Sequence, residues 1–142
     1  MNMSPEDIKR IIKDTLMEHL GIEYLEIGKG AVTARMPVDH RTLQPAGRLH
    51  GGAMMALAES VGSAGSFALI DPNRYEVLGV EISGSHVGNT SCNFVMAEGR
   101  LLHKGKTSHV WEILIKDENE RLLSVCRLTN RIIPVKPAAA EI

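Results

Sequence analysis

Apolar and polar residues are arranged along this chain in three different ways. Between residues 5 and 20, apolar side chains recur every three or four positions, which predicts an amphipathic helix. From residue 49 to residue 70 nearly every position is apolar or small, which is typical of a helix enclosed by protein. Elsewhere, short apolar segments between turn residues predict strands. The expected strands are 22–27, 31–38, 78–87, 93–103, 106–116 and 121–133.

The first predicted helix has clear start and stop signals. Ser4 can cap its N-terminus, Pro5 suits the first turn, and Gly21 marks the end. One apolar stripe predicts a surface helix that packs on the rest of the fold. This stripe consists of Ile8, Ile11, Ile12, Leu16 and Leu20.

The order of the elements predicts an α+β fold, because a helix, two strands and a long buried helix precede four strands joined by tight turns. A helix that is apolar all round needs a curved sheet to wrap it, and a second subunit is the natural source of further cover. The 142 residues are expected to form one domain, with its core at 21–133 and a tail at 134–142. The tail segment Pro137–Ala140 is expected to fray.

One carboxylate, Glu59, lies in the middle of the apolar helix, and no Lys or Arg occurs between Gly51 and Ile70. A buried carboxylate can be a structural group satisfied by hydrogen bonds, or a catalytic group whose pKa is raised by loss of hydration. Because an unpaired buried carboxylate costs stability, the functional interpretation is favoured. Glu59 and the small polar residues around it also argue against a membrane span.

Composition and charge exclude several classes of function. A net charge of −1 gives no electrostatic case for a nucleic-acid or anionic-membrane partner. Cys92 and Cys126 are too few for a disulfide framework or a metal knuckle, and free thiols fit a cytoplasmic protein. The N-terminus lacks the apolar segment of a signal peptide. No HExxH or CxxC motif is present, so no metal is expected.

Several short motifs together resemble the hotdog-fold acyl-CoA thioesterases. The motifs are Gln44-Pro45, Leu49-His50-Gly51-Gly52, Leu57-Ala58-Glu59-Ser60, Gly79–Ile82, His86-Val87, Leu102–Gly105, Val110–Ile113 and Arg127–Thr129. The likeness spans residues 21–133. It is greatest to the branch that hydrolyses aromatic acyl-CoA thioesters, namely the phenylacetyl-CoA, 4-hydroxybenzoyl-CoA and 1,4-dihydroxy-2-naphthoyl-CoA type enzymes.

This resemblance implies a curved antiparallel sheet around a long central helix. It also implies homodimers with two sites at the interface, often paired into tetramers, and hydrolysis of an acyl-CoA to free acid and CoA without a cofactor. Naphthoquinone (menaquinone) synthesis, aromatic degradation and proofreading of mischarged carriers all use such enzymes. The chain departs from its relatives at residues 88–93, and in the family the corresponding segment helps to hold the CoA phosphates.

The resemblance also assigns roles to particular residues. It makes the Gly51 N–H the oxyanion donor, with Gln44 and His50 nearby to orient the carbonyl group. Glu59 is the general base or the nucleophile, and both remain open. Ser63 either positions the water or Glu59, or bonds only to the helix carbonyl group of Glu59.

Six further residues are candidates for substrate binding: Gly52, Met55, His86, Val87, Lys104 and Gly105. His86 shares a strand face with Val80 and Ile82, so it is either an ordinary inward-facing histidine or a pocket residue. Lys104 and Gly105 either meet a CoA phosphate or form an ordinary charged turn. Met54, Met55 and Phe67 are expected to shape the acyl pocket.

The spacing of Gly51 and Glu59 predicts a shared site independently of the family. Eight residues of helix separate them, which corresponds to about 12 Å at about 1.5 Å per residue. A reacting carbonyl carbon and its attacking atom must approach to about 3–3.5 Å. If both residues are catalytic, the site must therefore combine the helix N-terminus of one subunit with Glu59 of another.

Two other functions remain open from the sequence. A hotdog dehydratase or hydratase would pair His50 with Glu59 for proton transfer at carbon. A non-catalytic acyl-CoA binding protein would use the same fold without turnover. The first is distinguished by an enoyl product without thiol release, and the second by binding without turnover.

Overall fold

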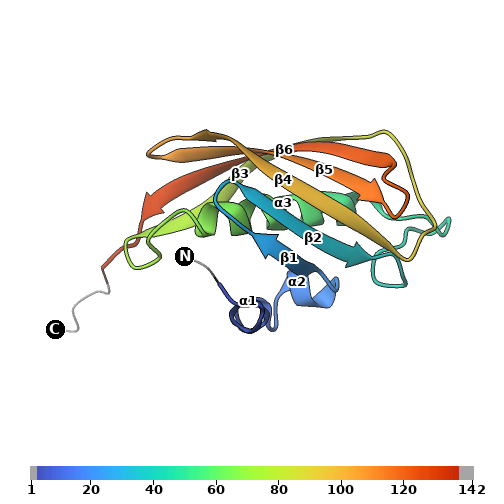
Figure 1. The fold of residues 1–142 in the computed structure, drawn as a ribbon, viewed down its shortest axis with the longest axis horizontal. Helices are drawn as coiled ribbons and strands as arrows, with labels where there is room; N and C mark the ends of the chain where they lie inside the picture. The colour runs from blue at the N-terminus through green and yellow to red at the C-terminus, as the bar shows by residue number, and fades with distance from the viewer. Residues whose placement is uncertain (1–2, 138–142) are drawn as a thin grey trace.

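The computed structural model describes residues 3–137. One antiparallel sheet of six strands curves around the long helix α3, with the strands in the order β1-β2-β4-β5-β6-β3 (Figure 1). The elements are α1 (Pro5–Ile12), α2 (Leu16–His19), β1 (Glu23–Ile27), β2 (Ala31–Pro37), α3 (Gly51–Phe67), β3 (Tyr75–His86), β4 (Phe94–Lys104), β5 (Ser108–Asp117) and β6 (Leu122–Pro134). The predicted α+β architecture, with a curved antiparallel sheet around a central helix, is confirmed.

The core lies between α3 and the concave face of the sheet. Strict alternation on β5 buries every second side chain, among them Trp111, which is fully buried. Gly62 and Gly65 allow α3 to approach closely, since a β-carbon at either position would collide with core side chains that include Trp111. The helix contributes Met54, Leu57, Ala58 and Val61 to this core.

The N-terminal region differs from the prediction of one continuous helix. Ser4 caps α1 as expected and forms a capping box with Asp7. The helix then ends at Ile12, because Asp14 takes a left-handed conformation with φ of 61°. The Asp14 backbone N–H donates to the Glu18 carboxylate at 2.7 Å instead of continuing the helix. The Thr15 hydroxyl also donates to the Ile12 backbone carbonyl, and such local bonds of short polar side chains compete with a continuing helix.

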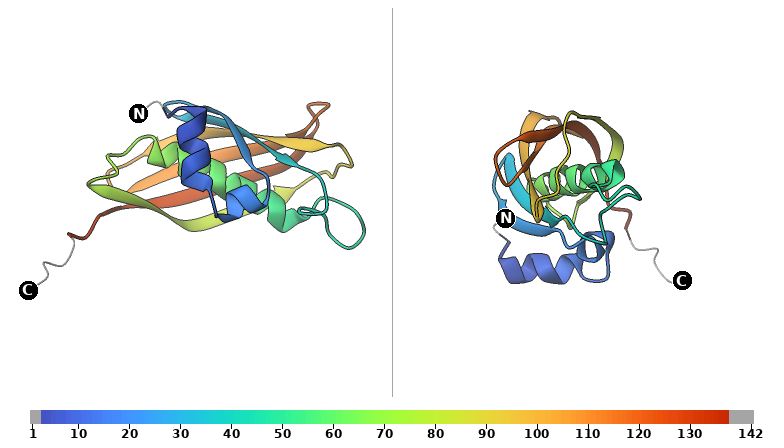
Figure 2. Two further views of the ribbon diagram at one scale, coloured as in Figure 1. Left: turned by 90° about the horizontal axis from the view of Figure 1, so that it is seen from below. Right: turned by 90° about the vertical axis from the view of Figure 1, so that its right-hand side faces the viewer.

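Figure 2 shows that α1 lies across the side of α3 that the sheet leaves open. Most of the apolar stripe predicted for this region lines a pocket together with residues of α3 and of the edge strands β1 and β3. Leu20 alone among the stripe residues is fully buried, while Ile11 and Leu16 remain 54% and 58% exposed. The N-terminal helices thus form a loosely packed wall over α3.

Strand β3 begins three residues before the predicted position and contains a register shift. In its pairing with β6, Gly79 faces Asn130 and Glu81 faces Thr129, so that Val80 is an extra residue. The shift interrupts the regular alternation on which the predicted common face of His86, Val80 and Ile82 rested; Val80 is 56% exposed, and His86 is exposed as well.

The sheet ends at β3 on one side and at β1 on the other. Along β3 the exposed side chains include the apolar Leu78 and Val80 beside polar residues such as Glu76 and Glu81, and this 12-residue edge is unpaired in the single chain. In the part of the chain that the structure describes, no helix has the length and apolar character needed to cross a membrane. Residues 138–142 of the predicted tail 134–142 lie outside the described residues.

Candidate active site

One stripe of α3 is accessible in the single chain, next to the edge strand β3. It contains Gly52, Met55, Ala56, Glu59, Ser60 and Ser63, all exposed or half-buried in the single chain. The prediction that Glu59 is buried is therefore wrong for one chain, because its side chain lies at β3, the edge strand beyond which the sheet gives no cover. If a second subunit covers Glu59, as expected, it must pack against this stripe.

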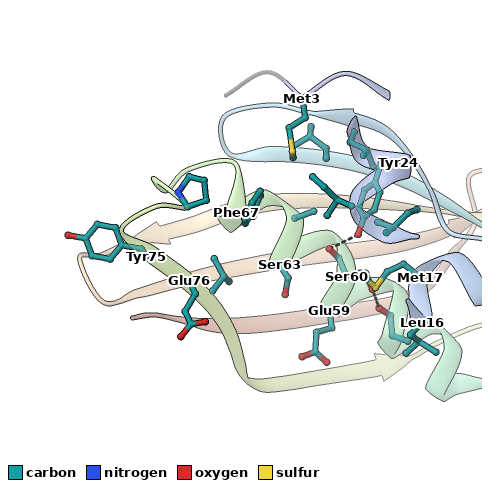
Figure 3. Close-up of a pocket in the computed structure, with 18 of the residues that line it drawn as sticks. Met3, Leu16, Met17, Tyr24, Glu59, Ser60, Ser63, Phe67, Tyr75 and Glu76 are labelled. Atoms are coloured by element: carbon teal, nitrogen blue, oxygen red, sulfur yellow. Dashed lines mark hydrogen bonds between the residues drawn. The ribbon is translucent and has the colours of Figure 1, made fainter. Parts of the chain in front are cut away.

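A pocket of about 670 Å³ lies beside this stripe, between α3, the N-terminal helices and the start of β3 (Figure 3). Its walls are mostly apolar and include Ile12, Met17 and Phe67. Glu59 and Ser63 contribute polar groups to the same pocket. The predicted lining residue Phe67 is thus part of the pocket, whereas Met54 is buried in the core on the other side of α3.

Tyr24 of β1 closes one wall of this pocket and is the clearest polar anchor there. Its hydroxyl donates to the Ser60 backbone carbonyl at 3.0 Å, which ties β1 to α3 (Figure 3). Burial raises the pKa of Tyr24 to about 12, so the phenol stays neutral at neutral pH. Tyr24 therefore adds a fixed, uncharged wall to the pocket.

The Glu59 carboxylate lies directly against β3 at Gly79. A β-carbon on Gly79 would collide with Glu59 Oε1, and it would lie 3.7 Å from Asn130 Oδ1. Glycine at position 79 therefore leaves the space that the carboxylate occupies. Because of this contact, Glu59 has a defined position although it is exposed to solvent.

Ser63 lies one helical turn after Glu59 and makes a contact that the sequence did not indicate. Its hydroxyl donates to Asn130 Oδ1 of β6 at 3.5 Å. The bond to the helix carbonyl group four residues earlier is made by Ser60, which donates to Ala56 O at 2.7 Å. Ser63 is thus directed toward the sheet.

The N-terminus of α3 has one capped and one free amide. His50 is the N-cap residue, and its Nδ1 accepts from the Gly52 N–H at 2.8 Å. This bond makes Nδ1 an acceptor, so the proton of a neutral His50 is on Nε2. No hydrogen bond to the Gly51 N–H is found among residues 3–137. The Gly51 amide is therefore available to an oxygen atom placed at the helix end.

His86 lies beside this free amide. A β-carbon on Gly51 would be 2.9 Å from His86 Nε2, so the imidazole ring occupies the space that a larger residue would need. The other ring nitrogen, Nδ1, is 2.9 Å from Ser124 Oγ. The next residue, Val87, is 62% exposed, and its N–H donates to Leu123 O. Of this predicted pair, only His86 lies at the helix N-terminus.

Two further predicted site residues, Gln44 and Met55, each make a contact of their own. The Gln44 side-chain oxygen accepts from the Ala46 N–H within its own loop. Met55 packs at Gly84 on β3, where a β-carbon would be 2.6 Å from the Met55 sulfur. Gln44 lies in the loop that leads into α3, and Met55 lies in the first two turns of α3.

Lys104 and Gly105 form the turn between β4 and β5, at the other end of the sheet (Figure 1). His109 faces Lys104 across this turn and hydrogen-bonds Ser66, which is near the end of α3. Within one chain, the turn is therefore at the opposite end of the helix from Gly51.

The structure thus divides the candidate residues into two groups within one chain. His50, Gly51 and His86 meet at the start of α3, and Glu59 and Ser63 meet two turns later. Sequence reasoning missed Gly79, Ser124 and Asn130. A glycine inside a predicted strand is a recognisable signal of close approach, but nothing local to Asn130 or Ser124 indicates which helix they face. In residues 3–137, no three His, Cys, Asp or Glu side chains form a metal-binding cluster.

Comparison with known proteins identifies the family of this chain. Residues 46–124 match the model of the thioesterase superfamily. The chain is 42% identical over 132 residues to the proofreading thioesterase EntH of Cronobacter turicensis, covering 93% of this chain and 96% of that one.

Two solved structures have nearly the same fold. Thioesterase PA1618 of Pseudomonas aeruginosa, as a mutant, superposes with a TM-score of 0.91 at 34% identity, covering 95% of this chain and 97% of that one. Thioesterase HI1161 of Haemophilus influenzae gives a TM-score of 0.91 at 33% identity, covering 98% and 96%. The chain therefore belongs to the thioesterase superfamily, has the hotdog fold and is a thioester hydrolase.

Proposed function

We propose that this protein hydrolyses an acyl-CoA thioester to a free acid and CoA, with Glu59 as the central catalytic residue. The observation that carries the proposal is the position of Glu59. Its carboxylate lies against Gly79 and lines a largely apolar pocket of about 670 Å³. An apolar pocket with a few polar groups at one place is typical of a site that binds an apolar substrate and reacts with one of its bonds.

Two routes are open to Glu59. As a general base it takes a proton from water, the water oxygen attacks the thioester carbon, and the carbon–sulfur bond breaks to release CoA thiolate. As a nucleophile its oxygen attacks the same carbon, CoA thiolate leaves, and water hydrolyses the resulting anhydride. Both routes produce the same acid and thiol, and both need stabilisation of negative charge on the carbonyl oxygen.

The start of α3 supplies groups for that charge. The Gly51 N–H is unpaired in the described chain, and the helix dipole favours negative charge at this end. His86 Nε2 lies beside it, and His50 caps the neighbouring amide. We assign Gly51 as the oxyanion donor, with His50 and Gln44 orienting the carbonyl group and His86 contacting the substrate.

The two groups of residues can meet in a homodimer formed through the free edge of β3. On the face of β3 toward α3, Gly79 contacts Glu59 and His86 contacts Gly51. Antiparallel pairing of two such edges centred on Ser83, with Val80 left unpaired as the extra residue of the register shift, places Gly79 opposite His86 of the partner subunit. Since paired strands are about 4.8 Å apart, Glu59 then lies near the partner subunit's Gly51.

This dimer also explains why the α3 stripe and the β3 edge are accessible in one chain. Pairing would cover Leu78 and Val80, and the partner helix would cover part of the stripe around Glu59. By resemblance to the family, we propose that two dimers pair into a tetramer. The mass of the assembly in solution, measured by light scattering, tests both levels.

We further propose that the acyl group is aromatic or fused-ring, such as 1,4-dihydroxy-2-naphthoyl. Support comes from the apolar walls formed by Ile12, Met17 and Phe67, with the neutral phenol of Tyr24 on one side. Gly52 and Met55 are assigned to the substrate path near the helix start, together with Val87. Lys104 and Gly105 are assigned to a CoA phosphate.

A second candidate substrate is an acyl group carried on a protein. A relative with 42% identity is named the proofreading thioesterase EntH, and proofreading of mischarged carriers is one use of the enzymes that this chain resembles. The chemistry at Glu59 would be the same, because a carrier protein presents its acyl group as a thioester. Such a substrate would make activity on free acyl-CoA weak.

The test is thiol release from a panel of acyl-CoAs spanning short-chain, long-chain, benzoyl and dihydroxynaphthoyl groups, with wild type and Glu59→Gln compared. Loss of the base or nucleophile should lower kcat about 10²-fold or more while circular dichroism stays unchanged. Selective turnover of aryl-CoA that collapses in the variant supports the proposal. An enoyl product without thiol release would indicate a dehydratase instead.

A further inference from the structure

A buried polar network behind α3 connects the sheet with Ser63. Asn130 on β6 is fully buried, and its Nδ2 donates to Ser66 Oγ at 2.9 Å and to Gly62 O at 3.3 Å. A backbone carbonyl can only accept, so the Gly62 contact fixes which end of the amide is nitrogen. The amide oxygen Oδ1 must therefore lie on the other side, toward Ser63.

Ser66 holds this amide in place because its own hydrogen bonds are complete. Its Oγ accepts from Asn130 Nδ2 and from Trp111 Nε1 at 2.9 Å. The remaining partner, His109 Nδ1, is 3.0 Å away, so the Ser66 proton is donated there. When every donor and acceptor of a buried network has a partner, its hydrogen bonds adopt a single arrangement. Asn130 is therefore held rigidly from behind.

The front of Asn130 faces the catalytic carboxylate. Its Oδ1 is 3.5 Å from Ser63 Oγ and 3.7 Å from the site of a β-carbon on Gly79, and the same β-carbon would collide with Glu59 Oε1. Because an amide oxygen only accepts, Ser63 must donate its proton to Asn130. The lone pairs of Ser63 then remain free to accept from a water molecule beside Glu59.

We propose that Asn130 is a positioning residue for the hydrolysis: it orients the Ser63 hydroxyl so that its oxygen accepts from the attacking water that Glu59 deprotonates. This inference rests on the proposed function. The 3.5 Å separation is long for such a bond, as is common in unliganded enzymes, where catalytic hydrogen bonds shorten once substrate is bound. Asn130 itself touches no substrate and acts through Ser63.

The rival explanation is that Asn130 only stabilises the fold. A double-mutant cycle separates the two, using Ser63→Ala, Asn130→Leu and the double variant. Leucine keeps the branched shape of asparagine but offers no acceptor. If Asn130 acts through Ser63, each single change lowers kcat about tenfold, KM changes little, and the double variant is no slower than Ser63→Ala alone.

Gly99→Ala is the matched control for lost stability. A β-carbon there would be 2.6 Å from Val61 Cγ1 in the core, away from the site. It should lower the melting temperature while kcat stays near the wild-type value. If Asn130→Leu does not fold, Asn130→Ser serves in its place, because its shorter side chain also withdraws the acceptor from Ser63.

Two results overturn the inference and leave the proposed function intact. One is an active wild type in which the effects of the two single changes multiply in the double variant. The other is an Asn130 variant that melts earlier but turns over at the wild-type kcat. Absence of thiol release by wild type from every thioester tested would instead overturn the proposed function, and the inference with it.

Discussion

Glu59 on α3 and Gly79 on β3 are in close contact: a β-carbon at position 79 would collide with a carboxylate oxygen of Glu59. The two residues come from different elements, and only glycine permits this approach. The contact positions an exposed glutamate at the wall of an apolar pocket. A larger residue at position 79 should therefore displace the Glu59 carboxylate without removing it.

Gly79→Ala should therefore lower kcat by about 10- to 100-fold, since a displacement of about 1 Å can cost 10²-fold in rate. The glutamate side chain can turn away, so the fold should survive. Thiol-release kinetics and circular dichroism measure both effects. Gly99→Ala is the control, because it crowds Val61 in the core and not Glu59. An unchanged kcat in Gly79→Ala would show that the position of Glu59 against β3 is irrelevant to turnover.

Mixing two inactive chains tests the shared site. Glu59→Gln removes the carboxylate, and Gly51→Pro removes the amide N–H at a helix position that tolerates proline. If each site takes one group from each subunit, a random 1:1 mixture should regain about one quarter of wild-type activity, because about half the dimers are mixed and each has one intact site.

The control for this experiment is Gly51→Ala. It keeps the N–H but adds a β-carbon 2.9 Å from His86 Nε2, so it reports the steric part of the change alone. Verified heterodimers without any regained activity would rule out a site divided between subunits.

Changes in the apolar pocket should alter the choice of acyl group. Ala64 lines the pocket from α3, and Ala64→Phe would fill part of the space beside Ser63. We expect kcat/KM for a fused-ring acyl-CoA to fall by about tenfold or more, with little change for a short-chain acyl-CoA. Phe67→Ala should shift the ratio the other way. Equal losses for both substrates would place the acyl group outside this pocket.

His109 should make stability depend on pH. Its burial first, and then the positive charges of Lys104 and His103, hold its pKa below the ordinary value. The folded state therefore binds fewer protons than the unfolded state between the two pKa values. The contribution of neutral His109 to the free energy of unfolding is fully present above about pH 6.5, and it is lost as the pH falls through the lower pKa of the folded state.

Urea unfolding between pH 7.5 and pH 5 measures this effect. The free energy of unfolding should decrease toward low pH in wild type, and His109→Gln should flatten the slope. The carboxyl groups of Asp39 and Asp117 also have lowered pKa values, but both titrate at lower pH and do not contribute in this window. The same slope in the variant would assign the effect to another histidine.

The elements themselves were largely predictable, since each rests on local periodicity. The strands and α3 appear close to their expected bounds, because alternation and helical spacing are properties of neighbouring residues. The N-terminal helix broke where Asp14 and Glu18 formed a local bond that competes with the helix. The side of α3 on which Glu59 lies could not be derived from composition, because the helix is apolar nearly all round.

By itself the sequence determined the α+β order of elements, the long central helix, and Gly51 and Glu59 as residues too far apart to serve one carbonyl within one chain. Only the tertiary structure decided that Glu59 is accessible in the single chain, that it lies against Gly79, and that Ser63 contacts Asn130, 67 residues further along the chain. The physical reason is that periodicity is a property of adjacent residues. Contacts between a helix and two strands depend instead on the order of strands in the sheet and on a register shift at Gly79.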